Sequence, residues 1–97
     1  MILTGKAKEA FLKHSIGKEI TLFETMLPIY QHALIIEWLD SVGIYVEVGY
    51  LHAYKEWYRD VSTETGSCYI RGWETRQQAT EKAIERAVEL FNGRSER

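Results

Sequence analysis

The sequence has one cysteine and three histidines, the residue types of thiolate nucleophiles and of most zinc sites: Cys68, His14, His32 and His52. A cysteine becomes a strong nucleophile when a neighbouring base favours its thiolate. Structural zinc sites need cysteine or histidine ligands at short spacings. The histidines are too far apart for a local metal motif, and no pattern places a base beside Cys68. We therefore predict no catalytic residue and no metal site, with Cys68 as a small apolar strand residue.

Two carboxylates, Glu37 and Asp40, lie within an otherwise apolar helical segment. A carboxylate in apolar surroundings often has a perturbed pKa and can mark a functional site. The simpler interpretation is that Glu37 lies at the helix edge or pairs with a base across an interface. With no motif that binds a cofactor either, the sequence predicts a non-enzymatic protein.

Aromatic residues make up 12% of the chain, and several fall on predicted strands. Strand alternation puts Tyr69, Arg71 and Trp73 on one face and Ile70 on the other. If the final helix covers the Ile70 face, the first three lie on the open face or beneath another helix. Aromatics beside an arginine can bind a protein or stack single-stranded bases. Burial in the core or in a self-association interface, a partner protein and nucleic acid all remain as interpretations.

The segment from Leu27-Pro28 to Ser41 is predicted to be a helix, because proline suits the first helical position and Gly43 follows as a stop. Its apolar residues surround the helix axis, which is typical of a helix buried on more than one side. One sheet covers one face only, so the other face needs the first helix or a second subunit. We therefore predict a homodimer and include Ile35, Trp38 and Leu39, with the Tyr69–Trp73 strand, in the interaction surface.

The remaining elements follow from periodicity and turn residues. A helix is predicted from an N-cap at Thr4 to about His14, ended by Gly17, and residues 18–26 fit either a short strand or a packed loop. Gly49 suggests a bulge or a close backbone approach, and Gly66 a turn with positive φ. Predicted strands span residues 44–54, 56–62 and 68–73.

The final helix is predicted most clearly, over about residues 74–92. Thr75 and Gln78 form a capping box, and apolar residues then fill half of the wheel, with Glu and Lys or Arg columns outside. Asn92-Gly93 is the predicted stop, followed by a polar tail over residues 94–97. The chain is thus predicted to be a single α+β domain, residues 1–97, in the order α-α-β-β-β-α.

The net charge of −2 argues against a dedicated nucleic-acid binder, because phosphate binding depends on clustered lysine and arginine. One cysteine allows no internal disulfide, which fits a reducing compartment. Charged residues interrupt every apolar run, so we expect no membrane partner and a cytoplasmic location.

The order β-β-β-α with an alanine-rich last helix resembles the double-stranded RNA-binding domain. That family implies RNA contacts from basic residues at the start of this helix. Arg76 and Lys82 are the bases available there, beside Glu74 and Glu81. A nucleic-acid-binding accessory domain therefore stands as the alternative function.

Several stretches together resemble small uncharacterised proteins of phages and other mobile elements of Bacteroides-like bacteria. They are Leu3-Thr-Gly-Lys6, Leu27-Pro28, Trp38-Leu-Asp-Ser-Val-Gly43, Thr75-Arg76, Ala83-Ile84 and Phe91-Asn92. No activity is assigned to that group. The resemblance implies a small accessory protein that interacts with a host protein, in addition to the self-association predicted from the apolar helix.

Overall fold

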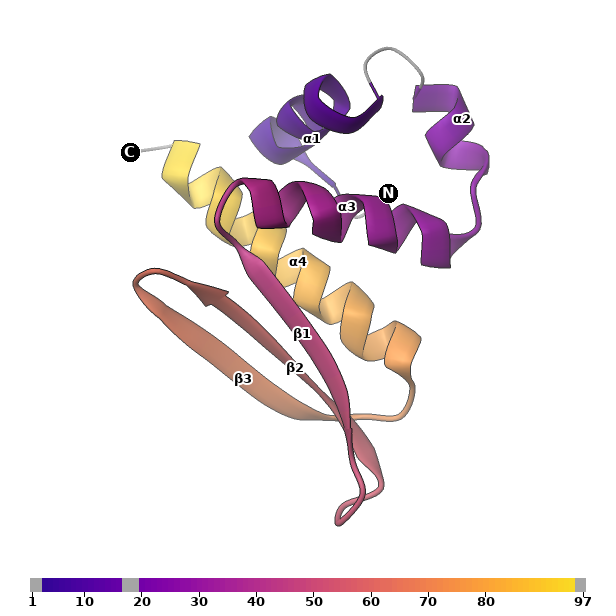
Figure 1. Cartoon of the computed structure of the whole chain (residues 1–97), viewed down its shortest axis with the longest axis vertical. Helices are drawn as coiled ribbons and strands as arrows, with labels where there is room; N and C mark the ends of the chain where they lie inside the picture. Colours follow the sequence, from indigo (N-terminus) through magenta and orange to yellow (C-terminus); the bar gives the residue numbers. More distant parts are fainter. Residues whose placement is uncertain (1–2, 17–19, 96–97) are drawn as a thin grey trace.

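The computed structural model describes residues 3–16 and 20–95 and has an α+β fold, which confirms the predicted class (Figure 1). The helices are α1 Gly5–Phe11, extended by a π-helical segment Leu12–Ile16, then α2 Ile20–Thr25, α3 Pro28–Ser41 and α4 Arg76–Ser95. The strands are β1 Tyr45–Leu51, β2 Glu56–Thr63 and β3 Gly66–Trp73. The predicted strand bounds are correct to within three residues.

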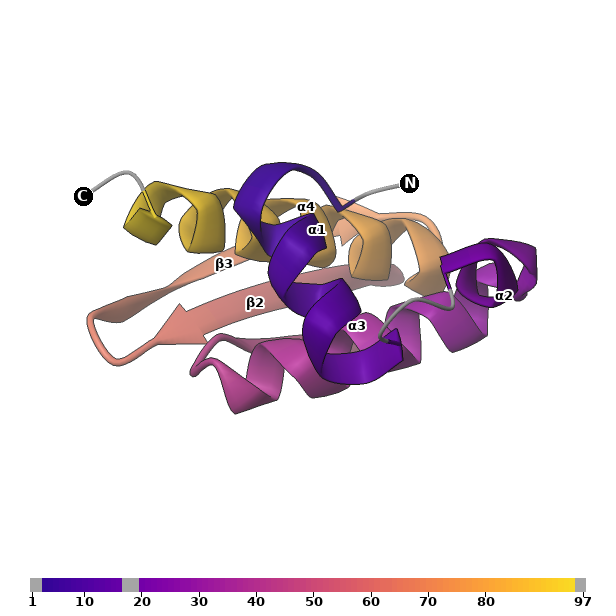
Figure 2. The same ribbon diagram turned by 90° about the horizontal axis from the view of Figure 1, so that it is seen from above.

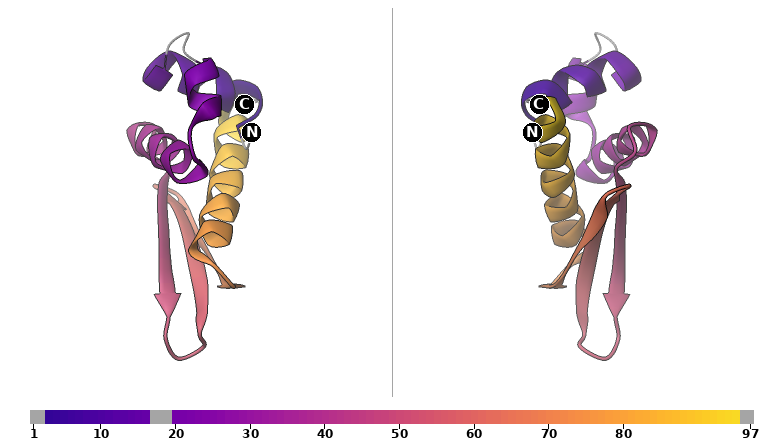
Figure 3. Two further views of the ribbon diagram at one scale, coloured as in Figure 1. Left: turned by 90° about the vertical axis from the view of Figure 1, so that its right-hand side faces the viewer. Right: turned by 90° about the vertical axis from the view of Figure 1, so that its left-hand side faces the viewer.

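The three strands form an antiparallel meander in the order β1-β2-β3. On one face, Val46 pairs with Val61 and Val48 with Arg59. Ile70 pairs with Arg59 and belongs to the same face. Helix α4 packs against this face, mainly over β1 and β2, and Figure 3 shows no helix over the opposite face of the sheet among the described residues.

The hydrophobic core lies where the C-terminal half of α4 meets the other helices. Figure 2 shows α1 crossing over both α3 and α4 at this end of the molecule. Phe11 contacts Phe23 with ring centroids 5.1 Å apart and Trp38 at 5.9 Å, and Trp38 contacts Phe91 at 5.0 Å. This aromatic cluster joins all four helices to one core.

The prediction for residues 18–26 is wrong, because residues 20–25 form helix α2 rather than a strand or a loop. Phe23 is 1% exposed and packs on Phe11, and its carbonyl accepts hydrogen bonds from Gln31 Nε2 at 2.9 Å and the Met26 amide at 3.1 Å. These tertiary contacts outweigh the strand preference of β-branched residues such as Thr21. Three helices therefore precede the sheet instead of two. Residues 18 and 19 lie outside the described residues.

Asn92 ends no helix, contrary to prediction, because α4 continues through Gly93 to Ser95. Its side chain instead caps α1: Oδ1 accepts from the Ala7 amide at 2.9 Å, and Nδ2 donates to the Thr4 carbonyl at 3.2 Å. Thr4 has the extended backbone of an N-cap but its side chain makes no capping hydrogen bond. The predicted helix end at Gly17 falls outside the described residues.

Three of the predicted helix boundaries are confirmed. Helix α3 begins at Pro28 and ends at Ser41, and Gly43 follows with φ +79°. At the start of α4, the Gln78 amide donates to Thr75 Oγ1 at 3.1 Å and Gln78 Oε1 accepts from the Thr75 amide at 3.3 Å. These are the two reciprocal bonds of a capping box.

Candidate interaction surface

The face of the sheet turned away from α4 carries a group of tyrosines and charged residues. Strand register places Glu47 beside Asp60, and Asp60 beside Tyr69. Tyr45 is 54% exposed and Tyr69 is 52% exposed. We call this surface the open face and define it by Tyr45, Glu47, Gly49, Tyr58, Asp60, Tyr69 and Arg71.

Gly49 allows the Tyr58 ring to lie flat against the neighbouring strand. A Cβ at position 49 would be 2.5 Å from Cε1 of Tyr58, so the ring would have to shift. The group that approaches Gly49 is thus a side chain, whereas the sequence predicted a bulge or a close backbone approach there. In this position the Tyr58 hydroxyl donates to Glu47 Oε1 at 2.8 Å. The hydrogen bond to Glu47, more than the surroundings, raises the pKa of Tyr58.

Arg71 lies at the side of the open face nearest the β1–β2 turn. Its guanidinium lies 3.8 Å from the centre of the Tyr54 ring, and its Nη1 is 3.8 Å from the Glu56 carboxylate. A cation over an aromatic ring and beside a carboxylate has much of its charge compensated. The Arg71 side chain is therefore fixed by its contacts with Tyr54 and Glu56 and is not a free cation.

The open face is acidic, because its arginine, Arg71, is already paired with Tyr54 and Glu56. Glu47 and Asp60 lie across from each other on β1 and β2. Asp60 Oδ1 is shielded from solvent, and no donor in the described part of the chain forms a hydrogen bond with it. The ring of Tyr58 packs at 5.3 Å from that of Tyr69 beside these carboxylates. The surface thus combines aromatic rings with unneutralised negative charge.

Trp73 does not share this face with Tyr69 and Arg71, contrary to prediction. Trp57 pairs with Trp73 but the next residue of β2, Tyr58, pairs with Arg71, so Gly72 is an extra residue in β3. Gly72 has φ +110°, which a residue with a side chain rarely adopts. This bulge turns Trp73 to the α4 side of the sheet.

Three other predicted interaction residues are core residues. Ile35, Trp38 and Leu39 are at most 2% exposed and pack inside the chain. Their prediction as a surface was wrong because α4, β1 and the π-helical segment together cover this side of α3. Helix α4 and the π-helical extension of α1 supply the cover that the sequence left to either the first helix or a second subunit.

The exposed apolar residues of α3 lie at its N-terminal end, where Leu27, Ile29 and Tyr30 are all more than 60% exposed. Next to them, a groove of about 420 Å³ runs between α3 and the start of α4. His32 lines it, 7% exposed and 3.9 Å from Glu81. Burial lowers the pKa of His32, and the nearby Glu81 carboxylate offsets part of that effect.

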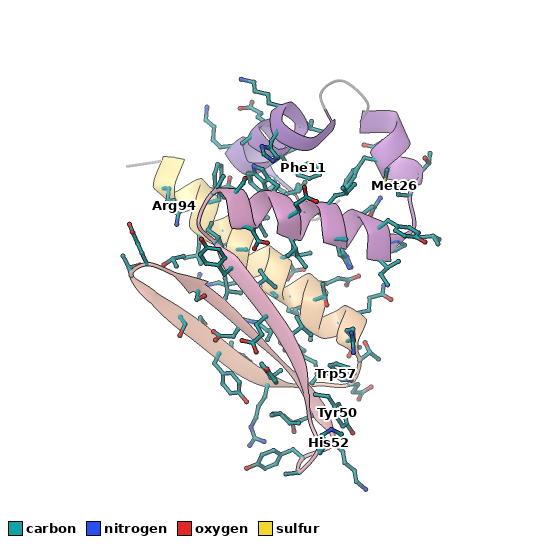
Figure 4. The ribbon with its side chains drawn as sticks, in the orientation of Figure 1. Phe11, Met26, Tyr50, His52, Trp57 and Arg94 are labelled. Atoms are coloured by element: carbon teal, nitrogen blue, oxygen red, sulfur yellow. The ribbon has the colours of Figure 1, made fainter. Side chains whose placement is uncertain are left out.

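A second aromatic group lies at the β1–β2 end of the sheet, on the α4 side. Figure 4 shows Tyr50, His52 and Trp57 together there. The ring of Tyr50 is 4.9 Å from that of His52 and 5.2 Å from that of Trp57, and the Arg76 guanidinium lies 4.7 Å over Trp57. The three rings and the guanidinium contact one another, so this group packs against itself at the end of the sheet.

The residues considered first for chemistry lie in separate regions. Cys68 lies near the β2–β3 turn, whereas His52 lies at the opposite end of the sheet. His14 lies in the π-helical segment and His32 on α3. Among residues 3–16 and 20–95, no three histidine, cysteine or acidic side chains are placed to hold a metal ion. Glu37 and Asp40 are both exposed on α3.

Comparison of this chain with protein families, with curated proteins and with solved structures finds no match. Within the described residues, no helix has the length and apolar character needed to cross a membrane.

Sequence reasoning found Tyr69 and Arg71 but not the acidic part of the open face. Glu47 and Asp60 lie on different strands, and only the register brings them together. A signal was present in the alternation, since Glu47 shares its strand face with Tyr45, and Asp60 shares its own with Tyr58. The sequence pattern does not show which positions of β1 and β2 pair with each other.

Proposed function

We propose that this chain is a small non-enzymatic accessory protein that binds a protein partner through the open face. The observation that carries the proposal is the group of Tyr45, Tyr58 and Tyr69 on a sheet face that no described helix covers. Exposed aromatic residues supply large contact areas and are enriched at protein interfaces. The resemblance to phage and mobile-element proteins supports an accessory protein of that origin acting on a host protein in the cytoplasm.

The partner presents basic side chains to this surface. Glu47 and Asp60 attract lysine and arginine, and each cation placed over a tyrosine ring contributes about 0.5–1 kcal/mol at an exposed site. Complementary charge also speeds the encounter and selects the partner.

Nucleic acid fits this surface less well. Phosphates would meet the carboxylates of Glu47 and Asp60, and the one arginine of the open face is already held by Tyr54 and Glu56. Trp73, which would add a stacking platform, faces the other side of the sheet. The open face therefore offers aromatic rings to nucleic acid, but among its defining residues no cation without a partner beside them.

The proposal is tested by NMR titration of the labelled protein with a short lysine-rich peptide, a glutamate-rich peptide of equal length and a single-stranded oligonucleotide. The lysine-rich peptide is expected to shift amide signals of β1, β2 and β3 on the open face, less so at high salt. The other two probes are expected to leave them unchanged.

A charge-matched pair of variants locates the binding. Glu47→Gln with Asp60→Asn should weaken peptide binding several-fold, whereas Glu85→Gln with Glu89→Gln, on the exposed side of α4, should not. Equal weakening by both pairs would indicate attraction by net charge alone. Open-face shifts with the oligonucleotide and none with the peptide would replace the proposal by the nucleic-acid alternative.

A further inference from the structure

Strand β3 forms an edge of the sheet, and the features of this strand that can block an edge, Arg71 and the bulge at Gly72, lie at its C-terminal end. Figure 1 shows no element beyond it on its outer side. An edge strand presents a row of unpaired N–H and C=O groups, and proteins usually block such edges with lysine, proline or a covering segment. From Gly66 to Gly72, β3 contains neither lysine nor proline, and Arg71 is its single charged residue.

The side chains near the middle of β3 are exposed on both faces of the sheet. Tyr69 is 52% exposed on the open face, and Ile70 is 42% exposed on the face that α4 covers elsewhere. Ile70 is exposed because α4 lies over β1 and β2 and barely reaches β3. The other edge, β1, is flanked by both α3 and α4. The two edges therefore differ in their contacts with the helices, and β3, which α4 barely reaches, leaves the apolar side chain of Ile70 uncovered.

From this geometry we infer that two copies of the chain pair their β3 strands antiparallel. The two-fold axis that relates them passes between the two Ile70 residues. The two sheets then become one of six strands. In this register Ile70 lies opposite the partner subunit's Ile70, on the α4 side. Tyr69 lies opposite the partner subunit's Arg71 on the open face, and the symmetry repeats that pair.

The choice of a second copy rests on the self-complementarity of this short sequence. Centring the axis on Ile70 gives one apolar pair and two tyrosine–arginine pairs, and places no like charges opposite each other. Moving the axis to Arg71 would place two guanidinium groups opposite each other, which is unfavourable. The bulge at Gly72 ends the regular ladder just beyond the pairs that the Ile70 register uses.

Two properties follow from this arrangement. Because the axis is perpendicular to the sheet, both open faces lie on the same side of the dimer and remain available. An interface limited to one strand edge is smaller than the ~800 Å² per partner of standard complexes. We therefore expect a reversible, concentration-dependent dimer, whatever the open face binds.

Cross-linking tests the register directly. In the Cys68→Ser, Ile70→Cys variant, the two introduced thiols face each other across the axis, where opposite Cβ atoms lie about 4.5–5.5 Å apart. Mild oxidation should produce a covalent dimer. The control Cys68→Ser, Glu85→Cys places the thiol on the exposed side of α4 and should not cross-link. Efficient cross-linking of Cys68→Ser, Tyr69→Cys instead of the Ile70 variant would overturn the Ile70 register.

Sedimentation equilibrium of the unaltered chain provides a test that needs no substitution. We expect the mass to rise from one chain towards two with concentration, and Ile70→Lys to abolish the rise while circular dichroism stays unchanged. A mass of one chain at all concentrations would overturn the inference. So would a dimer that Ile70→Lys leaves intact, because its interface would lie elsewhere. An extended peptide that pairs with β3 of a persistently monomeric chain would assign the edge to another protein.

Discussion

The two faces of the three-stranded sheet are made from alternate residues of the same strands, yet they lie in opposite environments. The face under α4 includes Val61, which is 1% exposed, whereas Tyr69, one strand away on the open face, is 52% exposed. Burying an aliphatic side chain contributes about 1.5–3 kcal/mol relative to leaving it exposed. The comparison assigns stability to one face and leaves the other available for binding.

The residues at the boundary between these roles are the informative ones. Gly49 belongs to the open face but its lack of a side chain is needed for packing, and Arg59 belongs to the covered face but carries a charge. The following substitutions compare the stability contributed by buried positions with that contributed by the open face.

The largest effect is expected from Trp38→Ala, in the core that continues from the covered face. Removing a ring that contacts both Phe11 and Phe91 should lower the free energy of unfolding by about 3–5 kcal/mol. Urea unfolding measures this change. Tyr69→Ala removes an aromatic ring from the open face and should cost less than about 1 kcal/mol. Equal costs would show that the open face also supports the fold.

Gly49→Ala should destabilise the chain by about 1–3 kcal/mol although it lies on the open face, because the new methyl group must displace the Tyr58 ring. The Tyr58 hydroxyl would then lose Glu47, and its raised pKa should return towards the usual value of 10.0 in an ultraviolet titration. In a Tyr58→Ala background the cost should largely vanish. A cost that persists there would have to come from the backbone at position 49.

Arg59→Met should raise the free energy of unfolding by roughly 1 kcal/mol. Arg59 is 6% exposed, donates from Nη1 to the Cys68 carbonyl at 3.0 Å, and has a buried Nε with no partner in the described chain. Methionine keeps the apolar stem and removes the cost of burying the charge. Thermal unfolding compares it with Arg71→Met on the open face, where the change should be smaller. A marked loss of stability would mean that the guanidinium does more for the fold than this single bond.

The smallest effect is expected at His32, between α3 and α4. Burial lowers its pKa below 6.5, so folding favours the neutral imidazole. That stabilisation is complete above the unfolded-state pKa and is lost as the pH falls through 6.5 towards the folded-state value. His32→Gln should therefore flatten the decrease in unfolding free energy below pH 6.5. An unchanged decrease would point to other titrating groups.

The elements that the sequence predicted correctly are those whose signals are local. Pro28 and the Thr75–Gln78 capping box set the starts of α3 and α4 through hydrogen bonds and backbone angles within one turn. Alternation along β1 and β3 separated Ile70 from Tyr69 before any pairing was known. The part of the open face formed by Tyr69 and Arg71 could be predicted for the same reason.

The errors concern residues whose environment is made by distant parts of the chain. Asn92 looked like a helix end but is recruited to cap α1 from 85 residues away. Trp73 changed face because the β2–β3 register required a bulge at Gly72. Ile35, Trp38 and Leu39 looked available for a partner because the sequence does not show which helices cover them.

The sequence alone thus determined the class of fold, the bounds of α3, the start of α4 and the alternation of its strands, because caps, turns and periodicity act over a few residues. The tertiary structure decided which apolar face is covered, which edge is left unpaired and which carboxylates join the tyrosines. Those outcomes depend on strand register and on the position of α4 over β1 and β2 rather than over β3. Both are set by long-range packing, for which no single segment carries a signal.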